Sequence, residues 1–196
     1  MALPKPIRPE YNLTIPSSGK RIKYQPFTVR EEKVLVLAAE SQETDEITNA
    51  IRNTLEHCVT TAGFSVDDLA LFDIEYLFLK CRSKSAGETI KVLATDPSDT
   101  EYSVEHEIDI DKIKVQKNKN HSDLITLEND THIKMRYPDL SFFETGVDMS
   151  SVAAMSKTLT KCITQIVVGE EVYARADMSD AEIEEWIDGL TQTQYQ

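Results

Sequence analysis

Alternation of apolar and polar positions marks the front of the chain as a β-hairpin. In residues 11–15 and again in residues 21–27, apolar side chains alternate with polar ones. A period of two is typical of a strand with one buried face. Residues 16–19, Pro-Ser-Ser-Gly, have the composition of a tight turn. The pattern therefore predicts a hairpin over residues 11–27.

After the hairpin, the sequence changes to patterns that predict helices. Thr28 and Glu31 form a capping box, a hydroxyl followed three positions later by a carboxylate, which predicts that a helix covers residues 29–40. Apolar residues recur at helical spacing in residues 45–60 and in residues 66–84. The last of these segments is apolar on more than one side, so we expect its helix to lie centrally.

The middle of the chain returns to alternation, which predicts a small antiparallel β unit over residues 88–138. Its expected strands cover residues 89–95, 102–110, 112–116, 124–127 and 132–137.

Two helices are predicted in the last third. One covers residues 151–168 and ends at Gly169, and the other begins at a second capping box formed by Ser179 and Glu182. The second helix has a narrow apolar stripe, and two interpretations of it stay open: it anchors in a groove of a partner, or it packs on its own core. The stripe consists of Ile183, Trp186, Ile187 and Leu190.

These elements predict an α+β fold, a helical body with an N-terminal β-hairpin and an inserted small antiparallel β unit. The first ten residues contain three prolines and are expected to be extended. The expected regions are the extended arm 1–10, the hairpin with helices 11–87, the β insert 88–138 and the C-terminal helical region 139–196.

The charge is acidic overall and unevenly distributed. The 196 residues have a net charge of −13, which argues against a general nucleic-acid binder, because phosphate contacts need clustered cations. Residues 1–30 hold six basic residues against one acidic residue, a net charge of +5, whereas residues 170–196 hold one against eight, a net charge of −7. Such polarity suits head-to-tail contacts between copies or contacts with partners, and the alternative is two solvated faces. On the hairpin, Lys20, Arg21 and Lys23 are candidates for steering an acidic partner surface.

No metal or cofactor site is predicted. The close pair His57-Cys58 is a poor chelator, because neighbouring helical residues point about 100° apart. His106, His121 and His132 lie in or beside the β unit, and the sequence does not bring them together. The glycines are isolated, so no phosphate-binding loop is expected. Stretches without charge are too short to cross a bilayer, so no membrane contact is expected.

The three cysteines, Cys58, Cys81 and Cys162, are too widely spaced for a disulfide framework and are expected to be buried thiols. Cys81 stands near Arg82 and Lys84. These cations either lower the pKa of its thiol, as in a cysteine nucleophile, or are partners of the helix dipole. No catalytic residues are predicted, and an enzyme is not expected.

Three strings of the sequence carry a resemblance to a known family. They are PSSGK at residues 16–20, PFTVREEK at residues 26–33 and FDIEYLFLKCRSKSAGE at residues 72–88. With the alternating segment that follows, they resemble the baseplate hub proteins of T-even-like contractile-tailed bacteriophages over most of residues 11–140.

The resemblance implies a viral, non-enzymatic late protein that builds the central hub of the tail baseplate. It would be a subunit of the virion or an assembly chaperone in the host cytoplasm, with other hub and tail proteins as partners and oligomerisation possible. Two alternatives stay open: a regulatory or host-directed binding protein that uses its acidic tail, and a hydrolase that uses Cys81.

Overall fold

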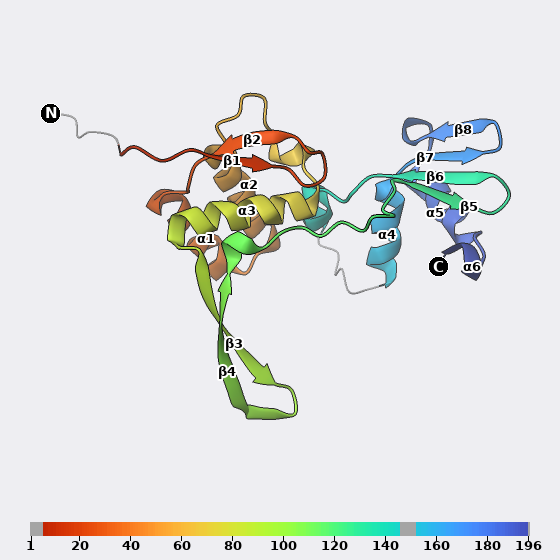
Figure 1. Ribbon diagram of the computed structural model, residues 1–196. Helices are drawn as coiled ribbons and strands as arrows, with labels where there is room; N and C mark the ends of the chain where they lie inside the picture. The colour runs from red at the N-terminus through yellow and green to blue at the C-terminus, as the bar shows by residue number, and fades with distance from the viewer. Residues whose placement is uncertain (1–5, 146–151, 196) are drawn as a thin grey trace. The chain divides into compact units, whose positions relative to one another are not determined.

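The computed structural model describes residues 6–145 and 152–195, and the chain divides into unit 1, Met1–Gln116, and unit 2, Lys117–Gln196. Figure 1 shows helices and separate antiparallel sheets along the chain. The α+β prediction is confirmed. The division into four regions stays a prediction.

Unit 1 begins with the predicted hairpin, formed by β1 (Tyr11–Thr14) and β2 (Arg21–Tyr24). Leu13 lies opposite Ile22 in the register, and both side chains are buried. Gly19 closes the turn with φ 69°, a backbone conformation that favours glycine, and its N–H donates to the carbonyl of Ile15 at 2.8 Å.

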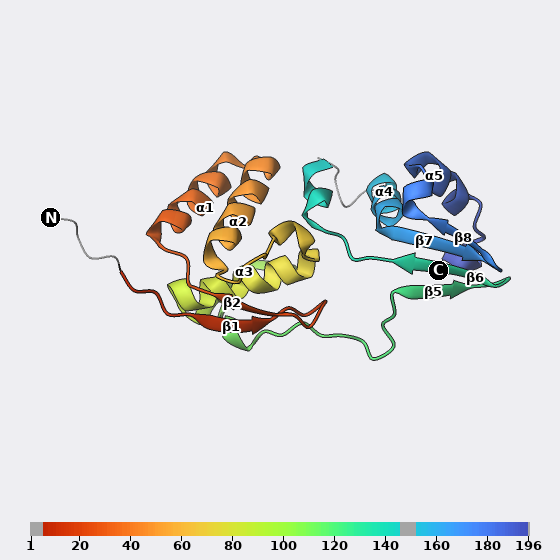
Figure 2. The ribbon, with the colours of Figure 1, turned by 90° about the horizontal axis from the view of Figure 1, so that it is seen from above.

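Three helices follow the hairpin, and α1 and α2 lie side by side (Figure 2). The capping box of α1 is confirmed, because Glu31 accepts from the Thr28 N–H at 2.8 Å. The helices are α1 (Val29–Ser41), α2 (Thr44–Cys58) and α3 (Leu71–Ala86).

The predicted third helix, residues 66–84, is divided in the structure. One 3-10 turn, η1 (Val66–Asp68), is followed by Leu69 and Ala70 with extended backbone, and only then does α3 begin. Both residues of the extended step are buried. The break therefore allows consecutive apolar side chains to reach the core of the unit.

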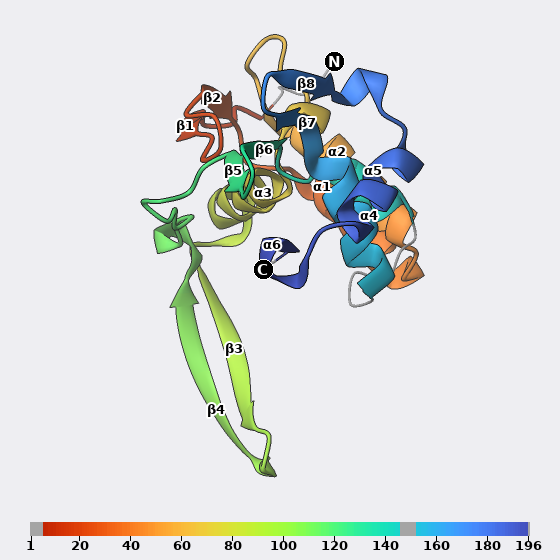
Figure 3. The same ribbon diagram turned by 90° about the vertical axis from the view of Figure 1, so that its right-hand side faces the viewer.

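A long ribbon projects from the rest of unit 1 (Figures 1 and 3). It consists of β3 (Thr89–Asp96) and β4 (Asp99–Asp109), which pair only with each other in the described sheets. The strand predicted over residues 112–116 is wrong. Asp109 caps a 3-10 turn, η2 (Ile110–Lys112), by accepting from two backbone N–H groups, and this turn ends the ribbon.

Unit 2 contains an antiparallel sheet in the order β5-β6-β7-β8. The expected β segment 88–138 therefore contributes strands to two separate sheets. The four strands are β5 (Leu124–Leu127), β6 (Thr131–Met135), β7 (Ile163–Val168) and β8 (Glu171–Ala174).

The helix predicted over residues 151–168 is wrong in its second half. Position 151 lies outside the described residues, α4 (Val152–Cys162) covers the first part, and the remainder is strand β7. β-Branched residues dominate the sequence of β7, ITQIVV, and they favour a strand once β6 and β8 offer pairing partners. The alternation of β8 was not recognised in the sequence.

Helices cover one face of this sheet. α4 and α5 (Asp180–Asp188) lie on the same side of it (Figure 2), and the capping box of Ser179 and Glu182 begins α5 as predicted. A register shift in the β6–β7 pair places Ile163 and Ile166, three positions apart, in the same core. The remaining short helical turns are η3 (Leu140–Thr145), η4 (Arg175–Asp177) and α6 (Gln192–Tyr195).

Candidate protein-interaction surfaces

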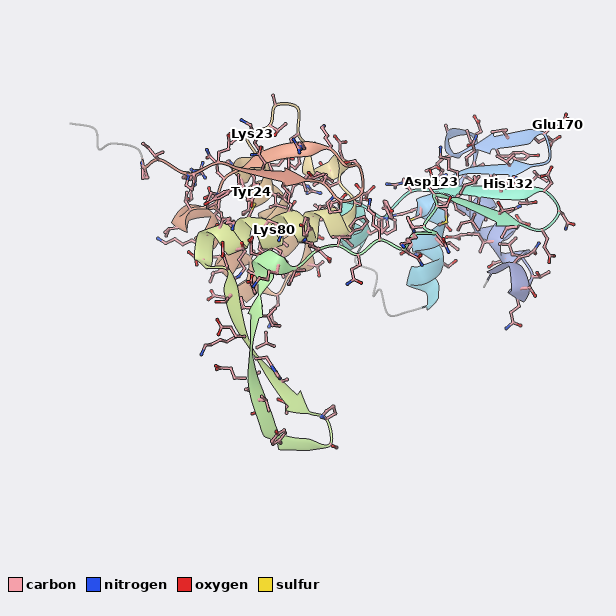
Figure 4. The ribbon with its side chains drawn as sticks, in the orientation of Figure 1. Lys23, Tyr24, Lys80, Asp123, His132 and Glu170 are labelled. Atoms are coloured by element: carbon pink, nitrogen blue, oxygen red, sulfur yellow. The ribbon has the colours of Figure 1, made fainter. Side chains whose placement is uncertain are left out.

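The three predicted cations of the first hairpin are exposed, but only two are free of ion pairs within the described residues. Lys20 and Arg21 lie at the turn end of β2. Lys23, labelled in Figure 4, donates to Glu10 at 2.9 Å, and this hydrogen bond raises the pKa of Lys23. Glu10 also accepts from Thr60 at 2.8 Å. The end of the N-terminal segment is thus fastened to unit 1.

Helix α1 exposes most of its large apolar side chains. Val29, Val36 and Leu37 are each at least half exposed, and Ala38 is the buried residue of this helix. The signal was present in the sequence: residues 34–37 are VLVL, and four consecutive positions surround a helix, so no single neighbour can cover them all.

The C-terminal apolar stripe packs mainly on its own unit. Ile183 and Ile187 are buried against Ile133 and Ile166 of the sheet, and Trp186 is partly buried at the edge of this cluster. Leu190 is also partly buried. Of the predicted contact residues, Ile183 has no exposed surface to offer, whereas Trp186 has some.

A groove of about 460 Å³ opens beside Trp186. Its floor is apolar and its rim carries the exposed carboxylates of Asp177 and Glu182, although Glu182 also accepts from the Ser179 N–H at 2.8 Å. Such a groove suits an apolar side chain next to a cation. The lining residues are Ile166, Val168, Tyr173, Asp177, Met178, Glu182, Ile183 and Trp186.

Hydrogen bonds in unit 1 connect the sequence strings that carry the family resemblance, and we call these connections joints. Asp73 on α3 is fully buried, and its Oδ1 accepts from the Ser17 N–H in the hairpin turn at 2.9 Å. The Ser85 hydroxyl accepts from the Phe27 N–H at 2.9 Å. These bonds link segments more than fifty residues apart and hold the hairpin against α3.

A third joint fixes the base of the β3–β4 ribbon. The Oδ1 atom of Asp111 accepts from Ser83 at 3.0 Å and lies 3.2 Å from the Lys84 ammonium. Burial alone would raise the pKa of Asp111, but the hydrogen bonds from Ser83 and Lys84 hold it below its ordinary value. Lys80, labelled in Figure 4, donates to the carbonyl of Asp111, and its ammonium lies 5.1 Å from the centre of the Tyr76 ring.

All three cysteines are buried free thiols, as predicted. Of the two interpretations of the cations near Cys81, the structure disfavours the lowered pKa, because a hydrogen bond with Cys58, together with burial, raises the pKa of the Cys81 thiol. A buried neutral thiol is a poor nucleophile. Arg82 and Lys84 are therefore better explained as cations near the end of α3.

The histidines of the β segment belong to two units and have separate surroundings. His106 belongs to the ribbon of unit 1, whereas in unit 2 His121 stacks on Tyr137 with ring centres 5.4 Å apart and His132 lies beside Thr126. Residues 6–145 and 152–195 contain no group of three or more His, Cys, Asp or Glu side chains suited to a metal ion. In the same residues no helix is both long and apolar enough to span a bilayer.

The protein thus belongs to the class of small α+β proteins that present apolar and charged patches on their surface. Comparison with known protein families matches residues 8–196 to the family described as T4 bacteriophage base plate protein. The chain belongs to this family, and it is therefore a structural component of the phage baseplate whose contacts are with other baseplate or tail proteins. No curated protein and no solved structure matches the chain.

Proposed function

We propose that this baseplate protein acts at the central hub of the tail, as a hub subunit or as a factor that assembles the hub, and that it works by protein contacts without catalysis. The family match over residues 8–196 is the observation that carries the proposal. The hub itself is supported by the three strings in residues 16–20, 26–33 and 72–88, which resemble hub proteins.

The surfaces of unit 1 support a contact role. Lys20 and Arg21 present positive charge on an otherwise acidic protein, and the exposed apolar side chains of α1 present a surface that water solvates poorly. The buried joints at Asp73 and Ser85 bind structural elements to one another, so these motif residues serve the scaffold.

Mass spectrometry of purified virions and of hub intermediates from infected cells tests the proposal. Peptides of this chain in both samples identify a hub subunit. Peptides in hub intermediates but not in virions identify an assembly factor. Absence from both samples, with the protein abundant in the cells, would contradict the hub proposal and favour a regulatory or host-directed role.

A charge reversal tests the role of the hairpin. The double variant Lys20→Glu, Arg21→Glu is expected to slow association with an acidic hub partner by about tenfold at low salt, because exposed charges act mainly on the association rate. The matched control is Lys117→Glu, Lys119→Glu, which makes the same charge change on exposed residues of unit 2. Equal effects of the two variants would assign the change to net charge and remove the hairpin from the proposal.

A further inference from the structure

The β3–β4 ribbon has two different faces. The register places Ile90 opposite Ile108 and Ala94 opposite Val104, and side chains two positions apart share a face of a strand. One face is therefore mostly apolar, and we call it the apolar face of the ribbon. It consists of Ile90, Val92, Ala94, Tyr102, Val104 and Ile108, together with His106, which lies opposite Val92.

The opposite face is mostly polar. Lys91 and Glu105 lie on it and form an ion pair at 2.7 Å, which confirms that they share this side. Leu93 is an apolar exception there. The ribbon thus has the pattern of a strand pair that buries one face, although it stands clear of the other elements of its unit (Figure 3).

Within the described residues of unit 1, nothing covers the apolar face. Tyr102 is 61% exposed, Val92 39% and Val104 37%, and the side chains at positions 91–95 and 102–108 are all exposed. The sheet has only two strands, so both outer edges carry unpaired backbone groups. An isolated two-stranded ribbon is only marginally stable in water, and exposed apolar surface of this kind marks a contact site.

The base of the ribbon is held firmly. Ile110 is fully buried, and its N–H donates to the carbonyl of Glu88 at 2.8 Å. Asp111 continues this anchor through its contacts with Ser83 and Lys84. A ribbon with a fixed base loses less conformational freedom on binding than a loose loop does.

The charge of the ribbon indicates what kind of surface covers it. Residues 89–109 contain one lysine and six carboxylates, a net charge of −5. Two copies that paired through their apolar faces would bring two such charges together, which is unfavourable. A partner with lysine and arginine beside an apolar surface has the complementary charge.

We propose that the apolar face of the ribbon docks on another baseplate protein, on an apolar surface rimmed by lysine and arginine. The inference rests on the proposed function, because the partner class is taken from it. It adds a contact site, on residues distinct from the hairpin and from the Trp186 groove, and it specifies the chemistry of the surface that binds there.

Site-specific cross-linking in infected cells tests the site directly. A photoreactive phenylalanine analogue at Tyr102 or Val104 samples the apolar face, and the same analogue at Leu93 samples the polar face. We expect cross-links from Tyr102 and Val104 to a phage baseplate protein, in a peptide with lysine or arginine beside apolar residues, and few from Leu93. Equal yields from both faces, cross-links to a second copy of this chain, or none would overturn the proposal.

Substitutions on the apolar face measure how much this contact contributes to the binding affinity. The triple variant Val92→Thr, Tyr102→Thr, Val104→Thr keeps strand-forming residues while removing apolar surface, and Leu93→Thr is the control. Loss of central contacts is expected to weaken association with purified baseplate intermediates by about tenfold or more, and the control is expected to bind like the unaltered protein. Circular dichroism of both variants shows whether unit 1 is folded, and a folded triple variant that binds normally would overturn the proposal.

The outcome also separates the two proposals. If the unaltered chain is present in hub intermediates and the triple variant enters them equally well, the ribbon site fails while the hub function stands. If the unaltered chain is absent from hub intermediates, the hub function itself fails.

A charge-reversed variant, Glu105→Lys with Glu107→Lys, changes the net charge of the ribbon from −5 to −1 and is expected to slow docking on a basic partner. Faster docking would contradict the proposed charge of the partner.

Discussion

Unit 1 contains two antiparallel hairpins with similar alternation and opposite surroundings. In the β1–β2 hairpin, Leu13, Ile22 and Tyr24 are buried in the unit, and burial raises the pKa of Tyr24 to about 12. In the β3–β4 ribbon, Val92 and Val104 face solvent. An apolar face on a strand pair indicates a surface that is suited to burial, but the pattern does not tell whether the same chain buries it.

The difference follows from long-range bonds at the two hairpins. Asp73 accepts from the turn of β1–β2 and Ser85 accepts from the chain just after β2, so this hairpin is bound to α3 near both ends. The ribbon is bound at its base, through Ile110 and Asp111. Its strands are also longer, and the ribbon extends away from the helices of unit 1 (Figure 1).

The largest expected effect is a difference in the free energy of unfolding of unit 1 when one apolar side chain is truncated in each hairpin. Ile22→Ala is expected to destabilise unit 1 by about 2–5 kcal/mol, because it leaves a cavity at a buried site. Val104→Ala is expected to change the stability by no more than about 0.5 kcal/mol, because it removes exposed atoms. Hydrogen exchange of unit 1 peptides in urea measures the stability change in both variants. Fluorescence of Trp186, the one tryptophan of the chain, follows unit 2 and serves as the internal control. Similar losses in the two variants would show that the ribbon is covered in solution.

The next effect concerns the bond that holds the first hairpin to α3. Asp73→Ala removes the acceptor of the partly buried Ser17 N–H and is expected to cost about 1–3 kcal/mol of unfolding free energy. Asp73→Asn keeps a carbonyl oxygen at that place, so it is expected to lose less. The exchange rates of amides in β1 and β2 report the change. If the alanine variant were as stable as the unaltered protein, the bond to α3 would not be what separates the two hairpins.

The smallest effect is expected at the base of the ribbon, where Asp111 is partly exposed and its interactions are screened. Its pKa in the folded state lies below the ordinary 3.8, so its contribution is present above pH 3.8 and is lost as the pH falls through the lowered pKa. Protection of the Ile110 amide, corrected for intrinsic exchange, should therefore fall at acidic pH. Asp111→Asn should lower this protection at neutral pH and reduce its pH dependence, whereas Glu105→Gln on the ribbon should leave the protection unchanged. Identical pH profiles for Asp111→Asn and the unaltered protein would show that this carboxylate does not hold the ribbon.

Local signals predicted most of the elements. Both capping boxes, at Thr28 and Ser179, begin helices where expected, because the hydroxyl and carboxylate that satisfy free N–H groups stand within four residues of each other. The errors occur where partners distant in the sequence decide. Ile163 and Ile166 fit a helical stripe, yet the neighbouring strands take that segment into the sheet. In the VLVL segment of α1, the sequence does not show which positions are covered, and Val34, Val36 and Leu37 are exposed.

The predicted contact residues divide in the same way. Lys20 and Arg21 could be chosen from the sequence, because a charged turn stays at the surface. Ile183 could not be separated from Trp186 in the sequence, since both fit one stripe, and only the packing of α5 on β6 and β7 shows that Ile183 is buried. The apolar face of the ribbon was visible as alternation, but its lack of a cover was not.

The periodicities, the caps, the turns and the distribution of charge could be predicted from the amino-acid sequence, because each depends on residues a few positions apart. Which apolar faces are covered could be seen in the folded chain alone, since burial depends on the position of segments far away along the chain. For this baseplate protein that difference matters directly: the same alternating pattern forms a piece of core in β1–β2 and an exposed face in β3–β4.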